Sequence, residues 1–131
     1  LVLGFACVGR HFQLQVGERV FYIDLIFFHL RLRRYVVIEL NTTRFEPELA
    51  GKLNFYLAAV DDLLRHPDDA TSVGLILCTS RDRVIVEYAL SDTGKPMGIA
   101  RWTTTKDLPD GLSGSLPTVE MLAAELRAAS E

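Results

Sequence analysis

The alternation of apolar and polar positions predicts three successive strands in the first third of the chain. Residues 12–16 alternate, a Gly-Glu turn follows, and residues 19–29 continue as a long and largely apolar strand. Residues 30–34 form a basic turn before a third strand at 35–41. The pattern therefore predicts a meander of three strands.

The period of the pattern changes after residue 45, which predicts a helix. Pro47 suits the first helical turn, and the acidic residues on either side of it suit the positive end of a helix dipole. Apolar residues recur at helical spacing to about Arg65, and residues 66–69 end the helix. An unbroken apolar run at 72–79 is typical of a buried strand. A strand, a helix and a buried strand form a crossover unit, so we expect the two strands to be parallel.

The rest of the chain contains one ambiguous segment, one strand and a closing helix. Residues 83–90 carry β-branched side chains that favour a strand, but a short helix is equally consistent with them. Residues 97–103 predict a last strand, and Pro117 opens a helix at about 118–129. The whole pattern predicts an α/β domain in which helices flank a mixed central sheet.

Composition limits the class of protein. A chain of 131 residues with 49% apolar and 24% charged residues is typical of one soluble globular domain, here residues 1–131. The net charge of −3 gives no global attraction to nucleic acid, so any such binding would need a local basic patch. No apolar run approaches the roughly 20 residues of a membrane span. Because the chain starts at Leu1 without a signal sequence, we expect the C-terminal part of a longer, cytoplasmic protein.

Several conspicuous side chains are expected to be structural. Cys7 and Cys78 lie in apolar runs without metal-type spacing, which predicts buried reduced thiols in a reducing compartment. Core positions are expected for three aromatic residues, Tyr22, Tyr56 and Trp102. The Asp-Asp pairs at 61–62 and 68–69 are expected to be solvated helix and loop charges.

Two carboxylates interrupt segments that otherwise predict buried strands. Asp24 lies within the second predicted strand and Glu39 near the end of the third. Burying an ionised carboxylate is costly unless a metal or a partner compensates, so the pair predicts a shared divalent cation, Mg²⁺ or Mn²⁺. The Leu40 carbonyl could add a third oxygen ligand. Asn41 lies two residues after Glu39, on the same predicted face, where it could position a water molecule.

A family resemblance is carried by short segments spread over nearly the whole chain. They are residues 21–25, 37–40, 45–47, 50–51, 54–57, 74–78, 86–90 and 114–118. In them the chain resembles the PD-(D/E)XK nuclease domain of the YhcG-like family. The resemblance implies a restriction-endonuclease-like core, a bacterial domain acting on DNA, and a further N-terminal domain upstream in the same protein. It also implies that Asp24 and Glu39 are the acidic residues of the family motif.

The chain departs from that motif at two positions. The family normally has a lysine where this chain has Asn41, and related proteins have a glutamine where Lys52 precedes Tyr56. The neighbours of Lys52 at helical spacing include Leu49 and Phe55, both apolar, so Lys52 borders the buried face. We hypothesise that Lys52 takes the role vacated at Asn41, with Tyr56 lining the site. The alternative is a surface lysine whose stem covers apolar area.

Arginines are dense around the third predicted strand. Arg31, Arg33 and Arg34 precede it and Arg44 follows it, and Arg10 belongs to a Gly-Arg step near the start of the chain. Arginine forks match phosphate groups, so these residues could contact a DNA backbone without reading its sequence. The alternative is a solvated turn with scattered arginines.

These observations predict a metal-dependent DNA endonuclease-like domain that hydrolyses phosphodiester bonds. A catalytically degenerate module of the same fold, which binds nucleic acid without cutting it, is the main alternative. A third hypothesis is an assembly domain in which the apolar strands form the interface of a dimer. A homodimer would also suit the cutting of two DNA strands.

Overall fold

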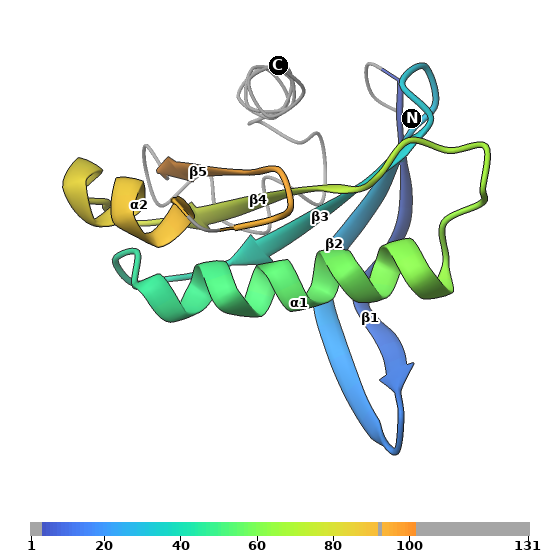
Figure 1. Cartoon of the computed structure of the whole chain (residues 1–131), viewed down its shortest axis with the longest axis horizontal. Helices are drawn as coiled ribbons and strands as arrows, with labels where there is room; N and C mark the ends of the chain where they lie inside the picture. The colour runs from blue at the N-terminus through green and yellow to red at the C-terminus, as the bar shows by residue number, and fades with distance from the viewer. Residues whose placement is uncertain (1–3, 92, 102–131) are drawn as a thin grey trace.

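A computed structural model describes residues 4–91 and 93–101, which form a five-stranded sheet with two helices (Figure 1). The strands are β1 (Phe5–Val16), β2 (Arg19–His29), β3 (Arg34–Leu40), β4 (Val73–Cys78) and β5 (Met97–Arg101). The helices are α1 (Pro47–Leu63), between β3 and β4, and α2 (Arg83–Leu90), between β4 and β5.

The sheet is mixed and its strands lie in sequence order. β1, β2 and β3 pair antiparallel, whereas β3, β4 and β5 pair parallel. This arrangement confirms the predicted α/β domain, with its meander followed by a crossover through α1. Three predictions lie outside the described residues. They are the end of the last strand at 102–103, the core position of Trp102 and the closing helix at 118–129.

Two element boundaries differ from the prediction or resolve it. β1 begins at Phe5 instead of residue 12, because a bulge between Cys7 and Gly9 and a left-handed backbone at His11 (φ 46°) interrupt the alternating pattern. The ambiguous segment 83–90 is a helix. Its N-cap is Asp82, whose carboxylate accepts hydrogen bonds from the first-turn N–H groups.

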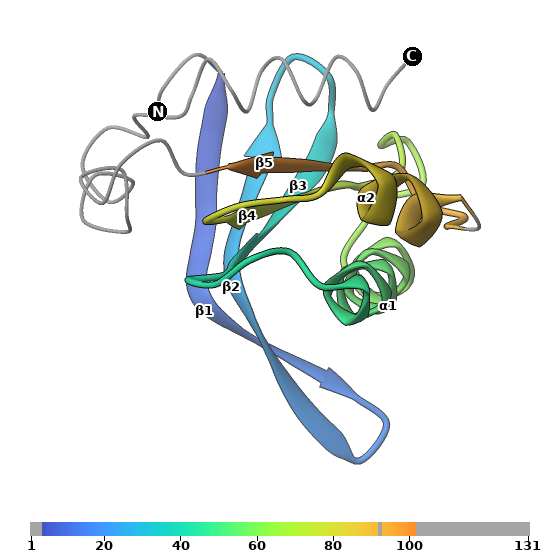
Figure 2. The ribbon, with the colours of Figure 1, turned by 90° about the vertical axis from the view of Figure 1, so that its left-hand side faces the viewer.

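Both helices pack on the same face of the sheet (Figure 2). The residues of α1 that are buried there include Ala50, Leu53, Tyr56, Leu57 and Val60. Gly74 of β4 permits this packing, since a Cβ at that position would lie 2.6 Å from a methyl carbon of Leu53. The opposite face of the sheet carries a second buried cluster, which includes Phe27, Ile38 and Leu75.

The β1–β2 hairpin extends past α1 as an arm, seen at the bottom of Figures 1 and 2. Its tip is the predicted turn, with Gly17 in the left-handed region (φ 62°). The Phe21 ring packs against Phe55 and Tyr56 of α1, with centroids 4.9 and 6.3 Å apart. These contacts join the base of the arm to α1.

Several side chains have roles that differ from the expected ones. Asp61 accepts the Ser72 N–H at 2.8 Å and pairs with Lys95 at 2.9 Å, and buried Asp69 pairs with Arg33 at 3.3 Å. The expectation of solvated charges is therefore wrong for these two aspartates, because they tie the α1–β4 loop to its surroundings.

Cys78 is buried as expected, but Cys7 is exposed. The expectation of a buried thiol is wrong for Cys7 because it lies in the edge strand β1, next to the bulge. Within the described ranges, neither helix is long and apolar enough to cross a membrane.

Candidate active site

Asp24 and Glu39 meet where β2 and β3 separate. The last register pair of these strands is Leu25 with Ile38, and one step further Asp24 and Glu39 face each other. Here the Leu40 N–H donates to Asp24 Oδ2 at 2.8 Å. A side-chain carboxylate thus accepts the hydrogen bond that a backbone carbonyl of the neighbouring strand would otherwise accept. The carboxylate of Asp24 is thereby fixed beside the end of β3.

Glu39 is a buried acid with an unsatisfied oxygen. The residue is 3% exposed, and its Oε2 lies 3.3 Å from Lys52 Nζ. That contact is an ion pair without hydrogen-bond geometry, and Oε2 has no hydrogen-bond partner among the described residues. Burial raises the pKa of Glu39, the hydrogen bond and charge of Asp24 raise it further, and Lys52 lowers it only in part, giving a value of about 8. The site therefore lacks the positive charge that two ionised carboxylates need.

Lys52 reaches this pair from α1. Its side chain is 51% exposed, and its Nζ lies 5.9 Å from the centre of the Tyr56 ring. Burial lowers the pKa of Lys52, but the negative charges of Glu39 and its neighbours outweigh that effect, so the net shift is upward. The pKa of Tyr56 is also raised, chiefly by burial. The structure thus brings together Asp24, Glu39, Lys52 and Tyr56.

Asn41 is held in the loop that leads from β3 to α1. Its amide nitrogen donates to the carbonyls of Thr43 and Arg44, both at 3.1 Å, and its amide oxygen accepts from the Thr43 hydroxyl at 3.3 Å. β3 ends at Leu40, so the strand alternation that placed Asn41 beside Glu39 no longer applies there.

The donor set fits a hard divalent cation. No group of three or more His, Cys, Asp or Glu side chains that could hold a metal occurs among residues 4–91 and 93–101. However, Mg²⁺ in enzymes commonly uses one or two carboxylates and completes its shell with water and substrate oxygens. Glu39, whose Oε2 has no hydrogen-bond partner among the described residues, and the Asp24 carboxylate, held by the Leu40 N–H, provide such a pair.

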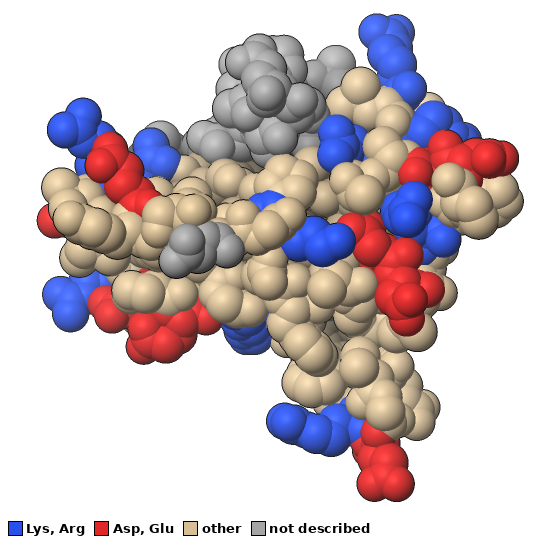
Figure 3. Space-filling view, viewed as in Figure 1, with Lys and Arg blue, Asp and Glu red and all other residues tan. Residues whose placement is uncertain are grey.

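The predicted arginines do not form one patch. Arg31, Arg33 and Arg34 lie at the β2–β3 turn, and Arg34 is about 16 Å along β3 from Glu39. Arg44 follows the other end of β3 and pairs with Glu46 at 2.8 Å. Figure 3 shows basic and acidic side chains interspersed on the face that it presents. Of the predicted DNA contacts, Arg10 lies nearest the carboxylates in register, since it pairs with Leu25 on β2.

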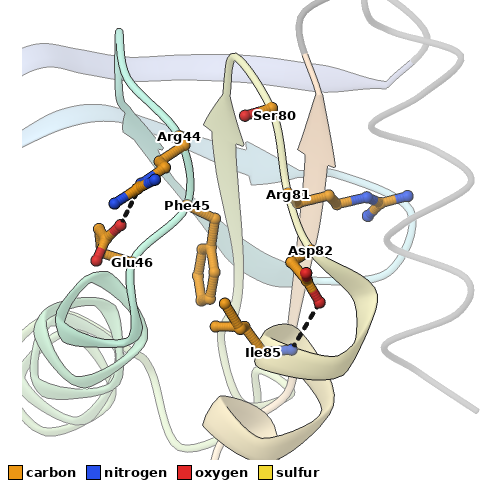
Figure 4. A pocket seen from close by; sticks show the side chains of 7 residues that line it. All are labelled: Arg44, Phe45, Glu46, Ser80, Arg81, Asp82 and Ile85. Carbon is orange, nitrogen blue, oxygen red and sulfur yellow. Dashed lines mark hydrogen bonds and ion pairs between the residues drawn. The ribbon is translucent and has the colours of Figure 1, made fainter.

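A hollow of about 390 Å³ lies beside Arg44, at the carboxyl ends of β3 and β4 (Figure 4). Phe45 forms part of it, with Glu46, Arg81 and Asp82 among the other lining residues. Arg44 pairs with Glu46, Arg81 donates to the Ile99 carbonyl, and Asp82 caps α2. The charges of the hollow are thus balanced, and it is not a basic site. Sequence reasoning missed it, although a polar run directly after a buried strand marks this edge of the sheet.

Sequence reasoning also missed an exposed ring pair on the arm. The rings of His11 and Tyr22 stack with centroids 4.2 Å apart and planes 7° apart, and Tyr22 is 44% exposed. The expectation that Tyr22 belongs to the core is therefore wrong, whereas Tyr56 is buried as expected. The signal was present in the sequence, because Tyr22 alternates with the apolar residues Phe21 and Ile23.

The mixed five-stranded sheet with its two helices has a restriction-endonuclease-like fold. Residues 1–117 match the family described as the YhcG PDDEXK nuclease domain, and the chain belongs to this family. A protein of Escherichia coli (strain K12) named "Putative nuclease YhcG" is 34% identical over 106 residues. The match covers 81% of this chain but 28% of that protein, so the chain spans little more than a quarter of its relative.

Two solved structures share the fold. One, described as an EndoMS–dsDNA2 complex, is 17% identical with a TM-score of 0.55, over 76% of this chain and 36% of the other. The second is a repair endonuclease from Pyrococcus abyssi, 13% identical with a TM-score of 0.51, over 76% of this chain and 38% of the other. The predicted family and the predicted fold are both confirmed.

Proposed function

We propose that this domain is a metal-dependent endonuclease that hydrolyses phosphodiester bonds of DNA. The observation that carries the proposal is the buried Asp24–Glu39 pair, with an unsatisfied Glu39 oxygen and Lys52 beside it. Support for DNA as the substrate comes from the EndoMS structure, which is described as a complex with double-stranded DNA.

Asp24 and Glu39 would hold Mg²⁺ or Mn²⁺, and the Leu40 carbonyl would add an oxygen ligand. When bound, such an ion lowers the pKa of a coordinated water and stabilises negative charge on a phosphodiester. The Leu40 N–H keeps the Asp24 carboxylate oriented for this task. Each of these groups is on a strand, so the site is set by the sheet and not by a loop.

Lys52 would act as a fixed positive charge. Although burial lowers the pKa of Lys52, the negative charges of Glu39 and its neighbours raise it overall, which favours its protonated ammonium form. It can donate hydrogen bonds to a phosphate oxygen or orient the attacking water. In this way Lys52 takes the role of the motif lysine that Asn41 replaces, while Asn41 holds the loop that leads to α1. Tyr56 would line the site beside Lys52, whose ammonium lies 5.9 Å from the centre of its ring.

Further parts of the proposal concern the whole protein. Arg10, Arg31, Arg33, Arg34 and Arg44 would contact the DNA backbone. An upstream domain would work with this one, as the partial match to the Escherichia coli relative suggests. A homodimer would place two sites on opposite DNA strands, and the cytoplasm would be the compartment.

The second candidate is a degenerate DNA-binding module, which the replacement of the motif lysine by Asn41 favours. The test is cleavage of supercoiled, linear and branched DNA in Mg²⁺ and in Mn²⁺. We expect metal-dependent cutting that Glu39→Gln abolishes and Lys52→Gln lowers by about 100-fold, with Lys52→Arg as the charge-conserving control. DNA binding without cutting in either metal would overturn the nuclease and favour the module.

A further inference from the structure

We propose that the stacked rings of His11 and Tyr22 form a platform for an unpaired nucleobase, so that the domain prefers DNA with a single-stranded nucleotide beside the cleaved phosphate. Flapped and branched DNA belong to this substrate class. The proposal rests on the proposed function and specifies its substrate.

The geometry of the ring pair is that of a stack that a further ring can extend. The two planes are 7° from parallel with centroids 4.2 Å apart. Tyr22 is 44% exposed, and His11 is exposed as well. Every nucleobase has a flat π face, so stacking on such a platform needs no particular base. In a paired duplex those faces are occupied by neighbouring base pairs, and only an unpaired base can use the platform.

The register places this pair beside the carboxylates. β1 pairs Arg10 with Leu25 and Phe12 with Ile23, so His11 lies opposite Asp24. Asp24 in turn lies opposite Glu39, and the three residues form a row across neighbouring strands. Tyr22 precedes Asp24 by two residues, about 7 Å along β2. A nucleotide held there would be next to a phosphate at the carboxylates.

The backbone of β1 is distorted at this place. His11 has φ 46°, the left-handed region that residues other than glycine rarely adopt. The bulge between Cys7 and Gly9 lies just before it. The distortion places the exposed His11 ring against Tyr22. Bulges and unfavourable backbone conformations of this kind are common at functional positions, where the surrounding structure compensates for their cost.

A basic residue adjoins the platform in the chain, since Arg10 directly precedes His11. A second arginine of the arm, Arg19, lies 4.8 Å from the centre of the Phe21 ring, on the other face of β2 from Tyr22. Arginines beside aromatic rings are the combination that binds single-stranded nucleic acid, since the charge follows the backbone while the rings stack on bases.

The test compares two DNAs of the same sequence, one fully paired and one with a single-stranded flap at the cleavage position. Binding is measured in Ca²⁺ from the fluorescence anisotropy of a dye at the far end of each DNA, and 2-aminopurine in the flap reports the stacking of the unpaired base. We expect tighter binding of the flap, which Tyr22→Ala weakens about 10-fold without changing duplex binding. Tyr22→Phe retains the ring and should bind like the wild type. Tyr88→Ala, which removes a 78% exposed tyrosine from α2, is the matched control.

A second variant separates the platform from folding. His11→Gly removes a ring at a position where glycine suits the backbone, and it should also weaken flap binding selectively. Replacing the flap nucleotide by an abasic one should weaken flap binding by the wild type, but should not change the affinity of Tyr22→Ala. Equal losses on flap and duplex, or equal wild-type affinity for both, would overturn the platform while Glu39-dependent cleavage could still stand. If the wild type neither binds nor cleaves any of these DNAs, the proposed function itself is overturned.

Discussion

At the scale of single residues, the site depends on one acid that the fold both buries and leaves short of partners. Glu39 is fixed by β3, faces Asp24 and has Lys52 as its cationic neighbour. Without a bound cation the folded domain favours the protonated form of Glu39. The charge state of this one side chain therefore links stability, pH and metal binding.

The pKa of Glu39 is raised from 4.5 to about 8, so its contribution to stability is full below pH 4.5 and is lost as the pH rises to about 8. Glu39→Gln imitates the protonated acid and removes this loss. In EDTA, we expect the melting temperature of Glu39→Gln to exceed that of the wild type by a margin that grows from pH 5 to pH 8. Thermal unfolding followed by circular dichroism measures it.

Glu48→Gln, at an exposed position in the first turn of α1, is the control for loss of a carboxylate. The difference in melting temperature between Glu48→Gln and the wild type should not grow from pH 5 to pH 8 as it does for Glu39→Gln. A Glu39→Gln margin that stays constant between pH 5 and pH 8 would contradict the raised pKa.

The same residues show what the sequence could and could not predict. Asp24, Glu39 and Lys52 could be selected from the sequence because each polar side chain interrupts or borders an apolar pattern. A charged group at such a position is costly to bury unless it has a partner. The role of Asn41 was not predictable, because its amide bonds depend on where β3 ends and how the loop turns. The exposure of Tyr22 was indicated by its alternation with Phe21 and Ile23, but its stack with His11 depends on how β1 and β2 pair in the arm.

At the scale of elements, the packing of α1 on β4 places Lys52 over the sheet. Gly74 is a point of close packing, and its missing side chain makes room for Leu53, the residue after Lys52. Any displacement of α1 at that point moves Lys52 relative to Glu39. The strands and α1 were predictable because their patterns are long, whereas the start of β1 and the nature of α2 depended on a bulge and a cap.

Gly74→Ala would put a Cβ 2.6 Å from Leu53 Cδ2 and 2.8 Å from its Cγ, so the Leu53 side chain, or α1 with it, would have to shift. We expect a loss of about 1–3 kcal/mol in the free energy of unfolding, together with weaker cleavage. Gly51→Ala, in the same helix with nothing near the added carbon, should instead gain about 0.5–1 kcal/mol. Chemical denaturation measures both, and a Gly74→Ala variant as stable as the wild type would contradict the close packing.

At the scale of the whole molecule, the chemistry is concentrated at one end of the sheet. The carboxylates and the ring pair on the arm lie around the point where β2 and β3 separate. The turn arginines lie at the other end of β3, and two of them are engaged locally, Arg33 with Asp69 and Arg34 with the Thr71 carbonyl. The proposed DNA contacts of the turn arginines are therefore about 16 Å from the carboxylates, along β3.

The central claim is that Asp24 and Glu39 form a divalent cation site, and calorimetric titration with Mn²⁺ tests it most directly. We expect saturable binding of one Mn²⁺ per chain to the wild type, lost in Glu39→Gln and in Asp24→Asn. Because the pKa of Glu39 is about 8, binding at pH 7 should release a proton, and the heat should change with the ionisation enthalpy of the buffer. Absence of saturable binding, or the same binding and buffer dependence in Glu39→Gln, would contradict the claim.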